Sequence, residues 1–259
     1  CVSGLMDFTH VFISRPRKES EELARMLASL GLEAVVQPAF NYFPLDARLS
    51  QQKEFEALDN ARSDSLVVFT SPRSVLHGLS QLPQHVMFNA RVGAIGPATA
   101  RALGDAGIRV TVMPKTGYTS EALLETLYEE KHDRLAEASR AFIIAAPGGR
   151  KKLLDGLVRQ GWKTSLIKVY KPEPADLDKG ALAALKDASG VLSIWTSANA
   201  MKGLSQRLPP ATWFQLCQGD WLVISERLRR LARAYGPARI HLCGGPGNTD
   251  LLNAVRGLL

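Results

Sequence analysis

The chain has 259 residues, of which 46% are hydrophobic, and its 32 basic and 25 acidic residues give a formal net charge of +7. This length is enough for one large or two medium globular domains, and no apolar run reaches the roughly 18 residues that a membrane-spanning helix needs. The positive surplus indicates an anionic partner, but the basic residues are dispersed along the chain, which disfavours nucleic acid.

Short β-branched and aromatic runs alternate with segments of helical period. Up to residue 130 we expect strand 10–16, helix 21–31, strand 33–40, an extended link through Pro44, helix 51–61, strand 65–71, helix 72–82, strand 91–96, helix 97–107, strand 108–114 and helix 119–130, capped by Ser120. Glycine after the last periodic residue ends several of these helices.

The second half continues in the same way. We expect strand 140–149, helix 150–161, an extended segment 163–172, strand 190–197, helix 198–208, strand 220–225, helix 226–236, strand 238–244 and helix 249–258. Repeated alternation of strand and helix predicts an α/β fold in which parallel sheets are covered by helices on both faces.

The chain also repeats itself. Two related pairs of segments follow each other in the order a, b, a′, b′, and they span 11–40, 66–130, 142–170 and 192–259. In a and a′ a strand ends before a proline, a helix ends at a glycine, and a second strand follows. The repeat predicts two similar domains, although these patterns do not decide whether a pairs with b or with b′.

Both b segments contain a strand that ends in Thr-Ser, at Thr70-Ser71 and at Thr196-Ser197. A Ser or Thr at such a junction usually caps the following helix. However, open α/β sheets bind ligands at the carboxyl ends of their strands, and the two pairs occupy equivalent points of the repeat. They are therefore either two ordinary helix starts or two halves of one binding site in a cleft between facing domains.

A glycine-containing turn, "VGAIGPATARAL", precedes one helix and includes Gly93, Gly96 and Thr99. Its spacing departs from the Gly-x-Gly-x-x-Gly fingerprint, and no acid ends the following strand, which disfavours dinucleotide binding. The free backbone amides of that helix start could instead hold a carboxylate.

No arrangement for strong side-chain catalysis stands out. The sequence has no Gly-x-Ser-x-Gly elbow, and "APGGRKK" is too short for a phosphate loop and lacks its hydroxyl. We therefore expect chemistry that depends on binding and orientation more than on a reactive side chain or a cofactor.

Cysteines and histidines give no sign of a metal centre. Cys1, Cys217 and Cys243 are far apart, which fits a reducing cytosol and neither a disulfide framework nor a zinc cluster. The five histidines show no ligand spacing; they are His10, His77, His85, His132 and His241. The first ten residues lack the basic start and apolar core of a signal peptide, so we expect a cytoplasmic protein.

From about Val11 to Leu259, the chain resembles the uroporphyrinogen-III synthase family. The motifs that carry this resemblance are, in order, "SRP", "FTSPRSV", "VGAIGPATARAL", "SEALL", "PGGR", "VY" ending at Tyr170, and "WTSANA". Each motif is weak alone, but their order and spacing over nearly the whole chain are specific.

The resemblance implies two similar α/β domains joined by a two-stranded connector, with the active-site cleft between them. One domain would be discontinuous, 1–38 and 173–259, and the other would be inserted, 43–168. The connector would be formed by 38–43 and 168–173. Segment a would then pack with b′.

The resemblance further implies a cofactor-free, monomeric lyase of tetrapyrrole biosynthesis, with no nucleic-acid or membrane partner. Its substrate would be hydroxymethylbilane, a linear tetrapyrrole polycarboxylate that suits a basic cleft rich in helix starts. The enzyme would remove the terminal hydroxyl and close the ring with inversion of the last pyrrole, giving uroporphyrinogen III.

Site residues follow from the matched motifs. Tyr170 is the best match for an acid that assists loss of the hydroxyl; the alternative is an aromatic residue that only packs in a connector strand. Hydrogen bonds to substrate carboxylates would come from Thr70, Ser71, Thr99, Thr196 and Ser197, with charge added by Arg15 and Arg150.

The sequence departs from the family in its last unit. Many members have a Gly-x-Thr-Ala-like turn where this chain reads "ISERLRRLA", so Ser225 and Arg227 stand where Gly and Thr are often found. Arg227 could bind an anionic ligand or simply face solvent.

Two other functions remain open from the sequence. A non-catalytic two-domain protein that binds a polycarboxylate would share the same hinge-and-cleft design, but such proteins are usually secreted. A two-domain glycosyltransferase would need a nucleotide site and usually a carboxylate for the ribose, and the motifs show neither.

Overall fold

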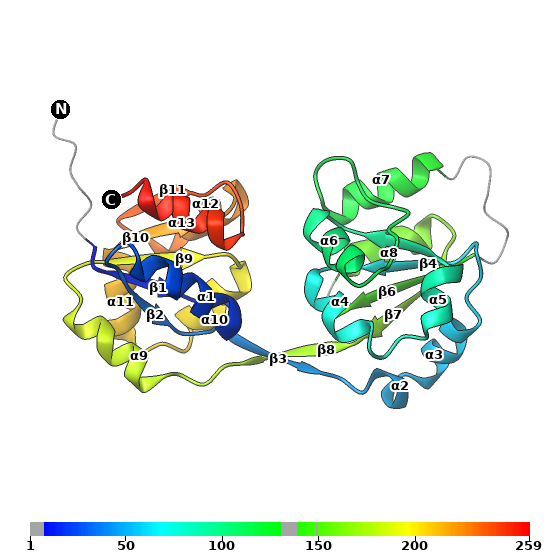
Figure 1. The fold of residues 1–259 in the computed structure, drawn as a ribbon, viewed down its shortest axis with the longest axis horizontal. Coiled ribbons are helices and arrows are strands. Elements are labelled where there is room, and N and C mark those ends of the chain that lie inside the picture. The colour runs from blue at the N-terminus through cyan, green and yellow to red at the C-terminus, as the bar shows by residue number, and fades with distance from the viewer. Residues whose placement is uncertain (1–7, 131–138, 149) are drawn as a thin grey trace. The chain divides into compact units, whose positions relative to one another are not determined.

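The computed structural model describes residues 8–130, 139–148 and 150–259. Cys1, His132 and Gly149, which belong to the patterns considered above, lie outside these ranges. Internal contacts divide the chain into two compact units. Unit 1 comprises Cys1–Asn41 and Glu173–Leu259, and unit 2 comprises Tyr42–Pro172 (Figure 1).

Unit 1 is built on a parallel sheet with the strand order β11-β10-β9-β1-β2. From one edge to the other the strands are Arg239–Leu242, Asp220–Val223, Val191–Trp195, His10–Ile13 and Glu33–Val36. Val11 pairs with Leu192, so segment a shares a sheet with segment b′. This is the strand pairing that the resemblance implies.

Helices cover both faces of the unit 1 sheet. On one face, α1 (Arg17–Ala28) and α13 (Asn248–Arg256) bury leucines against Val11 and Ile13. Four helices pack on the other face, around Trp195 and Trp221; they are α9 (Lys179–Ala184), α10 (Ala198–Ser205), α11 (Pro210–Gln218) and α12 (Glu226–Ala232). Short 3-10 turns at Leu185–Asp187 and Arg233–Tyr235 extend α9 and α12.

Unit 2 has a parallel sheet with the order β5-β4-β6-β7. Its strands are Arg91–Ala94, Leu66–Phe69, Arg140–Ala145 and Lys163–Lys168. One face carries α2 (Ala47–Ser50), α3 (Gln52–Asp59), α4 (Pro72–Gly78), α5 (Gln84–Asn89) and α6 (Pro97–Asp105). The other face carries α7 (Ser120–Glu130) and α8 (Lys151–Arg159).

The central strands show why the sequence forms sheets covered on both faces. All four residues of β4 are buried; Val67 and Phe69 face one core cluster, and Leu66 and Val68 face the other. Successive side chains of a strand point to opposite faces, so a continuous apolar run requires a helical layer on each side. The expected α/β fold with parallel sheets is confirmed.

The two sheets have equivalent topology. The order β10-β9-β1-β2 of unit 1 corresponds to β5-β4-β6-β7 of unit 2, and the place of β11 is taken in unit 2 by a single bridge between Gly93 and Val112. A separate two-stranded sheet consists of β3 (Phe40–Pro44) and β8 (Tyr170–Pro174). The chain passes from unit 1 to unit 2 within β3 and returns within β8.

Two local expectations are wrong, and both errors have a hydrogen-bonding cause. Segment 108–114 does not form a strand, because the Thr111 hydroxyl takes the Val92 amide (3.0 Å) that a strand ladder would use. The capping hydroxyl of α7 belongs to Thr119, which accepts from the Ala122 amide (3.1 Å), and Ser120 is instead the first helical residue. Helices α5, α9 and α11 lie in segments for which no element was expected.

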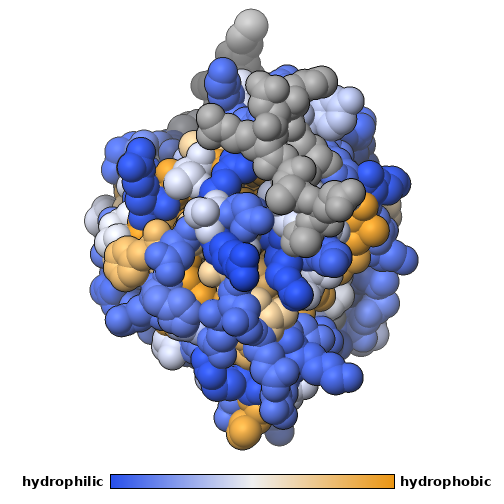
Figure 2. Space-filling view, turned by 90° about the vertical axis from the view of Figure 1, so that its right-hand side faces the viewer, coloured by the Kyte–Doolittle hydropathy of each residue, from blue (hydrophilic) through white to orange (hydrophobic). Residues whose placement is uncertain are grey.

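Exposed hydrophobic side chains are scattered over unit 2. The face of this unit in Figure 2 is mainly hydrophilic, with hydrophobic colour broken into separate patches. The largest exposed apolar side chains of unit 2 lie on different elements; they include Leu49, Leu76, Phe88 and Val158. Isolated apolar side chains of this kind are common on protein surfaces.

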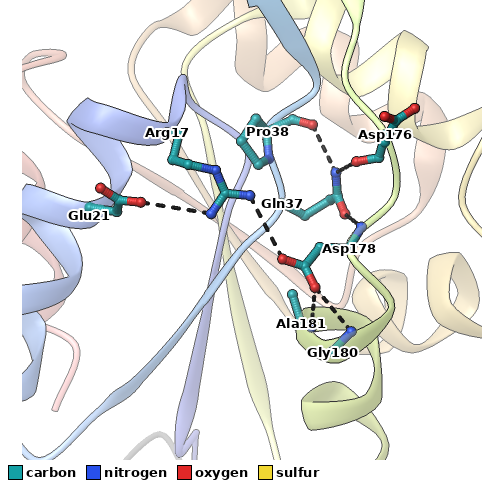
Figure 3. A network of polar contacts seen from close by, with 8 residues as sticks. All are labelled: Arg17, Glu21, Gln37, Pro38, Asp176, Asp178, Gly180 and Ala181. Carbon is teal, nitrogen blue, oxygen red and sulfur yellow. Dashed lines mark hydrogen bonds and ion pairs between the residues drawn. The ribbon is translucent and has the colours of Figure 1, made fainter.

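Gln37 fixes the two unit 1 segments that lead to and from the connector (Figure 3). This side chain is fully buried, and its Nε2 donates to the carbonyls of Pro38 (2.9 Å) and Asp176 (3.1 Å). Its Oε1 accepts from the Asp178 amide (2.7 Å). The Asp178 carboxylate caps α9 and lies 3.7 Å from Arg17, so Gln37 joins the two segments and Asp178 adds a contact with the first helix.

Gln37→Leu should destabilise unit 1 markedly. The substitution leaves the buried Pro38 carbonyl and the partly buried Asp176 carbonyl and Asp178 amide without this partner, and a buried group left unpaired costs about 1–3 kcal/mol. We therefore expect the free energy of unfolding to fall by about 3 kcal/mol, read as a lower urea midpoint by circular dichroism. The same substitution at exposed Gln52 is the control and should shift the midpoint little. Equal shifts for the two variants would contradict this role.

Candidate substrate-binding site

A polar pocket lies at the carboxyl edge of the unit 1 sheet. Thr196 and Ser197 follow β9, Ser225 and Arg227 follow the neighbouring strand β10, and these residues line a cavity of about 280 Å³ together with Asn199. Parallel strands end at the same edge of a sheet, so the two adjacent turns bring their side chains together. The remaining lining residues are Ala198, Ile224 and Leu228.

The hydroxyls of the pocket differ in what they already bind. Ser197 accepts a hydrogen bond from the Ala200 amide (3.4 Å) and caps α10, and Ser225 accepts from the Leu228 amide (3.3 Å) and caps α12. The half-buried Thr196 hydroxyl has no partner among the residues that the structure describes. Thr196 is therefore the pocket hydroxyl most available to a ligand.

Arg227 supplies the charge of the pocket. Its side chain is exposed and makes no ion pair or hydrogen bond within the described part of the chain. By contrast, Arg229 on the same helix is paired with Glu226 (2.8 Å). A guanidinium group can bind a carboxylate through two parallel N–H donors, so this pocket suits a carboxylate ligand.

Arg15 follows β1 at the same edge of the sheet, but it already has partners. Its Nη1 donates to Asn248 Oδ1 (2.6 Å), its Nη2 lies 3.2 Å from Glu19, and only 11% of the side chain is exposed. Arg15 is not among the residues that line the cavity. In this structure it fixes the start of α13 to the end of β1.

The equivalent turn of unit 2 holds the other Thr-Ser pair. Thr70 is buried and its hydroxyl donates to the Ile144 carbonyl (3.0 Å). Ser71 and Ser74 cap each other's amides at the start of α4 (3.1 Å each). Arg150, in the left-handed region with φ 63°, donates to the Thr70 carbonyl (3.1 Å), so Arg150 and the Thr-Ser pair lie together.

The turn before α6 can be compared with the turn before α12 by matching the N-cap residues of the two helices. Gly96 caps α6 and Ser225 caps α12. Counting from these caps, Thr99 corresponds to Leu228, and Arg227 corresponds to Ala98. Thr99 is buried, and its hydroxyl makes no hydrogen bond with the described residues. In unit 1 the Thr99 position is therefore held by Leu228 and not, as the sequence suggests, by Arg227, which lies one residue earlier.

Tyr170 is the first residue of β8 and is 8% exposed. Its ring packs edge-on against Tyr42 at 6.0 Å and lies 5.3 Å from the His77 ring, with an angle of 31° between the latter planes. The hydroxyl has no hydrogen-bond partner among the described residues. Unlike the indole nitrogens of Trp162 and Trp195, it is not one of the fully buried polar atoms without a partner. A ligand could therefore reach the hydroxyl while the ring stays packed.

His77 and Arg73 complete the surroundings of Tyr170. Burial, and secondarily the nearby Arg73 cation, lower the pKa of His77 below its ordinary value of 6.5. The imidazole is therefore neutral at neutral pH. The Arg73 guanidinium stacks 3.6 Å above the centre of the Tyr42 ring. Sequence patterns did not single out Arg73 or Tyr42, although Arg73 lies only two residues beyond Ser71.

Among the described residues, no three His, Cys, Asp or Glu side chains are grouped as metal ligands. No described helix is both long and apolar enough to cross a membrane. Of the predicted site residues, the structure brings Thr196, Ser197, Ser225 and Arg227 into one pocket. Asn199, which also lines it, was missed although it lies within the "WTSANA" motif.

Sequence comparison gives consistent matches. The profile of the family described as uroporphyrinogen-III synthase HemD matches residues 21–252. The uroporphyrinogen-III synthase of Escherichia coli is 28% identical over 253 residues, which cover 95% of this chain and 99% of that protein. A putative uroporphyrinogen-III synthase of Methanothermobacter thermautotrophicus is 30% identical over 202 residues, or 73% of this chain and 76% of that protein.

Solved structures give the same fold. A mutant uroporphyrinogen III synthase of Thermus thermophilus matches with a TM-score of 0.63 and 18% identity, covering 96% of this chain and 98% of that chain. The uroporphyrinogen-III synthetase of Helicobacter pylori matches with a TM-score of 0.60 and 16% identity, covering 96% and 99%. At these identities the likeness concerns the fold alone.

The fold and the site define a class of protein. It has two α/β units of equivalent topology, and the carboxyl edges of its sheets carry hydroxyl and guanidinium groups suited to carboxylates. The family profile extends over most of the chain, and the Escherichia coli relative matches nearly all of it. The chain belongs to the uroporphyrinogen-III synthase family.

Proposed function

We propose that this chain, as a lyase of its family, cyclises hydroxymethylbilane to uroporphyrinogen III with loss of water. The observation that carries the proposal is the unit 1 pocket, in which the Thr196 hydroxyl and the Arg227 guanidinium line one cavity without partners among the described residues. A polycarboxylate substrate matches such donors, and the net charge of +7 favours its approach.

The reaction needs control of geometry as well as acid assistance. Loss of the terminal hydroxyl as water leaves a cationic azafulvene, which the last pyrrole ring attacks through its substituted position. The resulting spiro intermediate breaks, and that ring rejoins inverted. The carbon that forms the last bond releases a proton, which balances the proton consumed with the leaving hydroxyl. Without the enzyme, hydroxymethylbilane closes to the uninverted isomer, so binding must orient the pyrrole rings of the substrate.

Substrate carboxylates are bound in this proposal by the turns that follow the strands. In unit 1, Thr196 donates through its hydroxyl and Arg227 through its guanidinium group. Ser197 and Ser225 use their hydroxyls as helix caps, so they contribute mainly by fixing the turn. In unit 2, Thr99 offers a hydroxyl, and Thr70, Ser71 and Arg150 shape the adjoining turn. Arg15, which is paired with Glu19 and Asn248, contributes by holding the start of α13 at the edge of the unit 1 sheet.

Tyr170 is the proposed acid. Its hydroxyl lacks a protein partner among the described residues, and its ring is held by two neighbouring rings. A phenol can donate a proton or a strong hydrogen bond to the leaving hydroxyl. We further propose that the chain works as a cytoplasmic monomer without metal, organic cofactor, nucleic-acid or membrane partner.

Analysis of the product isomers tests this function. Purified protein is incubated with hydroxymethylbilane, and the oxidised products are separated into type I and type III isomers. We expect type III to dominate, including after dialysis of the protein against a chelator. A binding protein without activity would leave the type I isomer of uncatalysed closure as the product. Loss of activity on chelation, with recovery on adding zinc or magnesium, would contradict the cofactor-free reaction.

A further inference from the structure

The ring of Tyr170 belongs to the core cluster of unit 2 and has two aromatic neighbours, Tyr42 and His77. Tyr170 begins β8, and its neighbour Tyr42 belongs to β3, so both come from the two strands in which the chain crosses between units. Their edge-on contact at 6.0 Å relates one connector residue to another. By itself it does not fix the phenol relative to the body of unit 2.

His77 adds a ring contact from α4. Its ring centre lies 5.3 Å from that of the Tyr170 ring, and the two planes are tilted by 31°. Offset aromatic pairs are favourable beyond the area that they bury. Because α4 packs on the sheet of unit 2, this contact connects Tyr170 to a rigid element.

Helix α4 is held tightly at the position of His77. The next residue is Gly78, where a Cβ atom would lie only 3.0 Å from Cγ2 of Ile144 in the central sheet. At its other end, the capping pair Ser71 and Ser74 closes the first turn. The helix therefore has little freedom to shift, which keeps the backbone of His77 in place.

The Gln81 side chain bridges the backbone of His77 and the backbone next to Tyr170. Nε2 of Gln81 donates to the His77 carbonyl (2.7 Å) and to the carbonyl of Val169 (3.2 Å), the residue before Tyr170. The Gln81 Oε1 accepts from the Ala47 amide (2.9 Å). One side chain thus sets the spacing between the residues that carry the two rings.

We propose that His77 is a positioning residue that holds the ring of Tyr170 in the orientation required for proton donation to the substrate. The inference rests on the proposed role of Tyr170. His77 need not touch the substrate or exchange a proton. The imidazole acts as a neutral ring, in keeping with its lowered pKa.

Substitutions at position 77 separate a ring contact from other roles. His77→Ala removes the ring and should lower kcat roughly three- to tenfold with KM changed less than about twofold, because misplacement of a catalytic group slows the chemical step. His77→Phe keeps a flat ring and should restore kcat to within about twofold of the unsubstituted protein. His85→Ala, at an exposed histidine of the same unit, is the matched control and should leave kcat unchanged.

A double-substitution cycle supplies the decisive measurement. If His77 acts through the Tyr170 hydroxyl, His77→Ala should have almost no further effect on kcat in a Tyr170→Phe background. Independent, multiplicative losses would overturn the proposal, and so would normal kcat for His77→Ala or failure of His77→Phe to restore it. Should His77→Ala not fold, His77→Gln, which also lacks the ring, replaces it in each comparison.

The same cycle distinguishes failure of this inference from failure of the function on which it rests. Normal kcat for Tyr170→Phe, with type III product still formed, would refute the role of Tyr170 and the role of His77 with it. A large loss for Tyr170→Phe combined with normal kcat for His77→Ala would refute His77 alone. Absence of type III product from the unsubstituted protein would refute the function itself.

Discussion

Tyr170→Phe should lower the turnover of hydroxymethylbilane at least about tenfold, because general acid assistance is typically worth a factor of about 10² to 10⁴. Loss of the substrate hydroxyl is difficult unless its oxygen receives a proton or a strong hydrogen bond. The Tyr170 hydroxyl has no hydrogen-bond partner among the described residues, whereas the hydroxyls of Thr70 and Ser71 already have protein partners.

The melting temperature of Tyr170→Phe should stay close to that of the unsubstituted protein. Phe keeps the ring contacts with Tyr42 and His77, and the missing hydroxyl has no hydrogen bond within the described residues to lose. Single-turnover measurements of product formation, together with thermal unfolding, check both expectations. Tyr128→Phe, at an exposed tyrosine on α7, is the control. Turnover near normal in a well-folded Tyr170→Phe variant would leave Tyr170 as connector packing.

The parts of the fold that were predictable are those in which burial decides the structure. A fully apolar run such as Leu66–Phe69, or a buried run with a single serine such as Val191–Trp195, fits a strand covered on both faces, and a periodic segment ending at glycine fits a surface helix. Segment 108–114 has equally good strand residues. It fails because a single hydroxyl, that of Thr111, competes with the backbone for a donor, and side-chain competition of this kind is not visible in hydrophobic patterns.

The sequence predicts where the site residues lie in the chain, but not which of their polar groups are already bound to other protein groups. Thr196 and Ser197 are adjacent in one motif, yet geometry makes Ser197 a helix cap and leaves Thr196 without a partner among the described residues. Arg15 has the right charge and place in the chain, but its partner Asn248 comes from the other end of the sequence. The ring contact between His77 and Tyr170 has the same origin, because it arises from packing between distant segments.

Arg227→Ala should raise KM for hydroxymethylbilane about tenfold and change kcat much less. A charge-assisted hydrogen bond to a carboxylate is worth about 1.5–3 kcal/mol, and partial exposure to water reduces that value. The contact is made with a side group of the substrate and not with the reacting atoms, so it stabilises the bound substrate and the transition state alike.

The shape of the guanidinium group allows a sharper version of this prediction. Arg227→Lys keeps the positive charge but loses the paired donors, so its KM should lie between those of Arg227→Ala and the unsubstituted protein. Arg230→Ala removes an exposed cation from the same helix outside the pocket, and it should leave KM within about twofold. Because exposed charges are screened by salt, the KM difference between Arg227→Ala and the unsubstituted protein should shrink as ionic strength rises. Equal KM increases for Arg227→Ala and Arg230→Ala would show that only the total charge matters, and the unit 1 pocket would then lose its assignment as a carboxylate site.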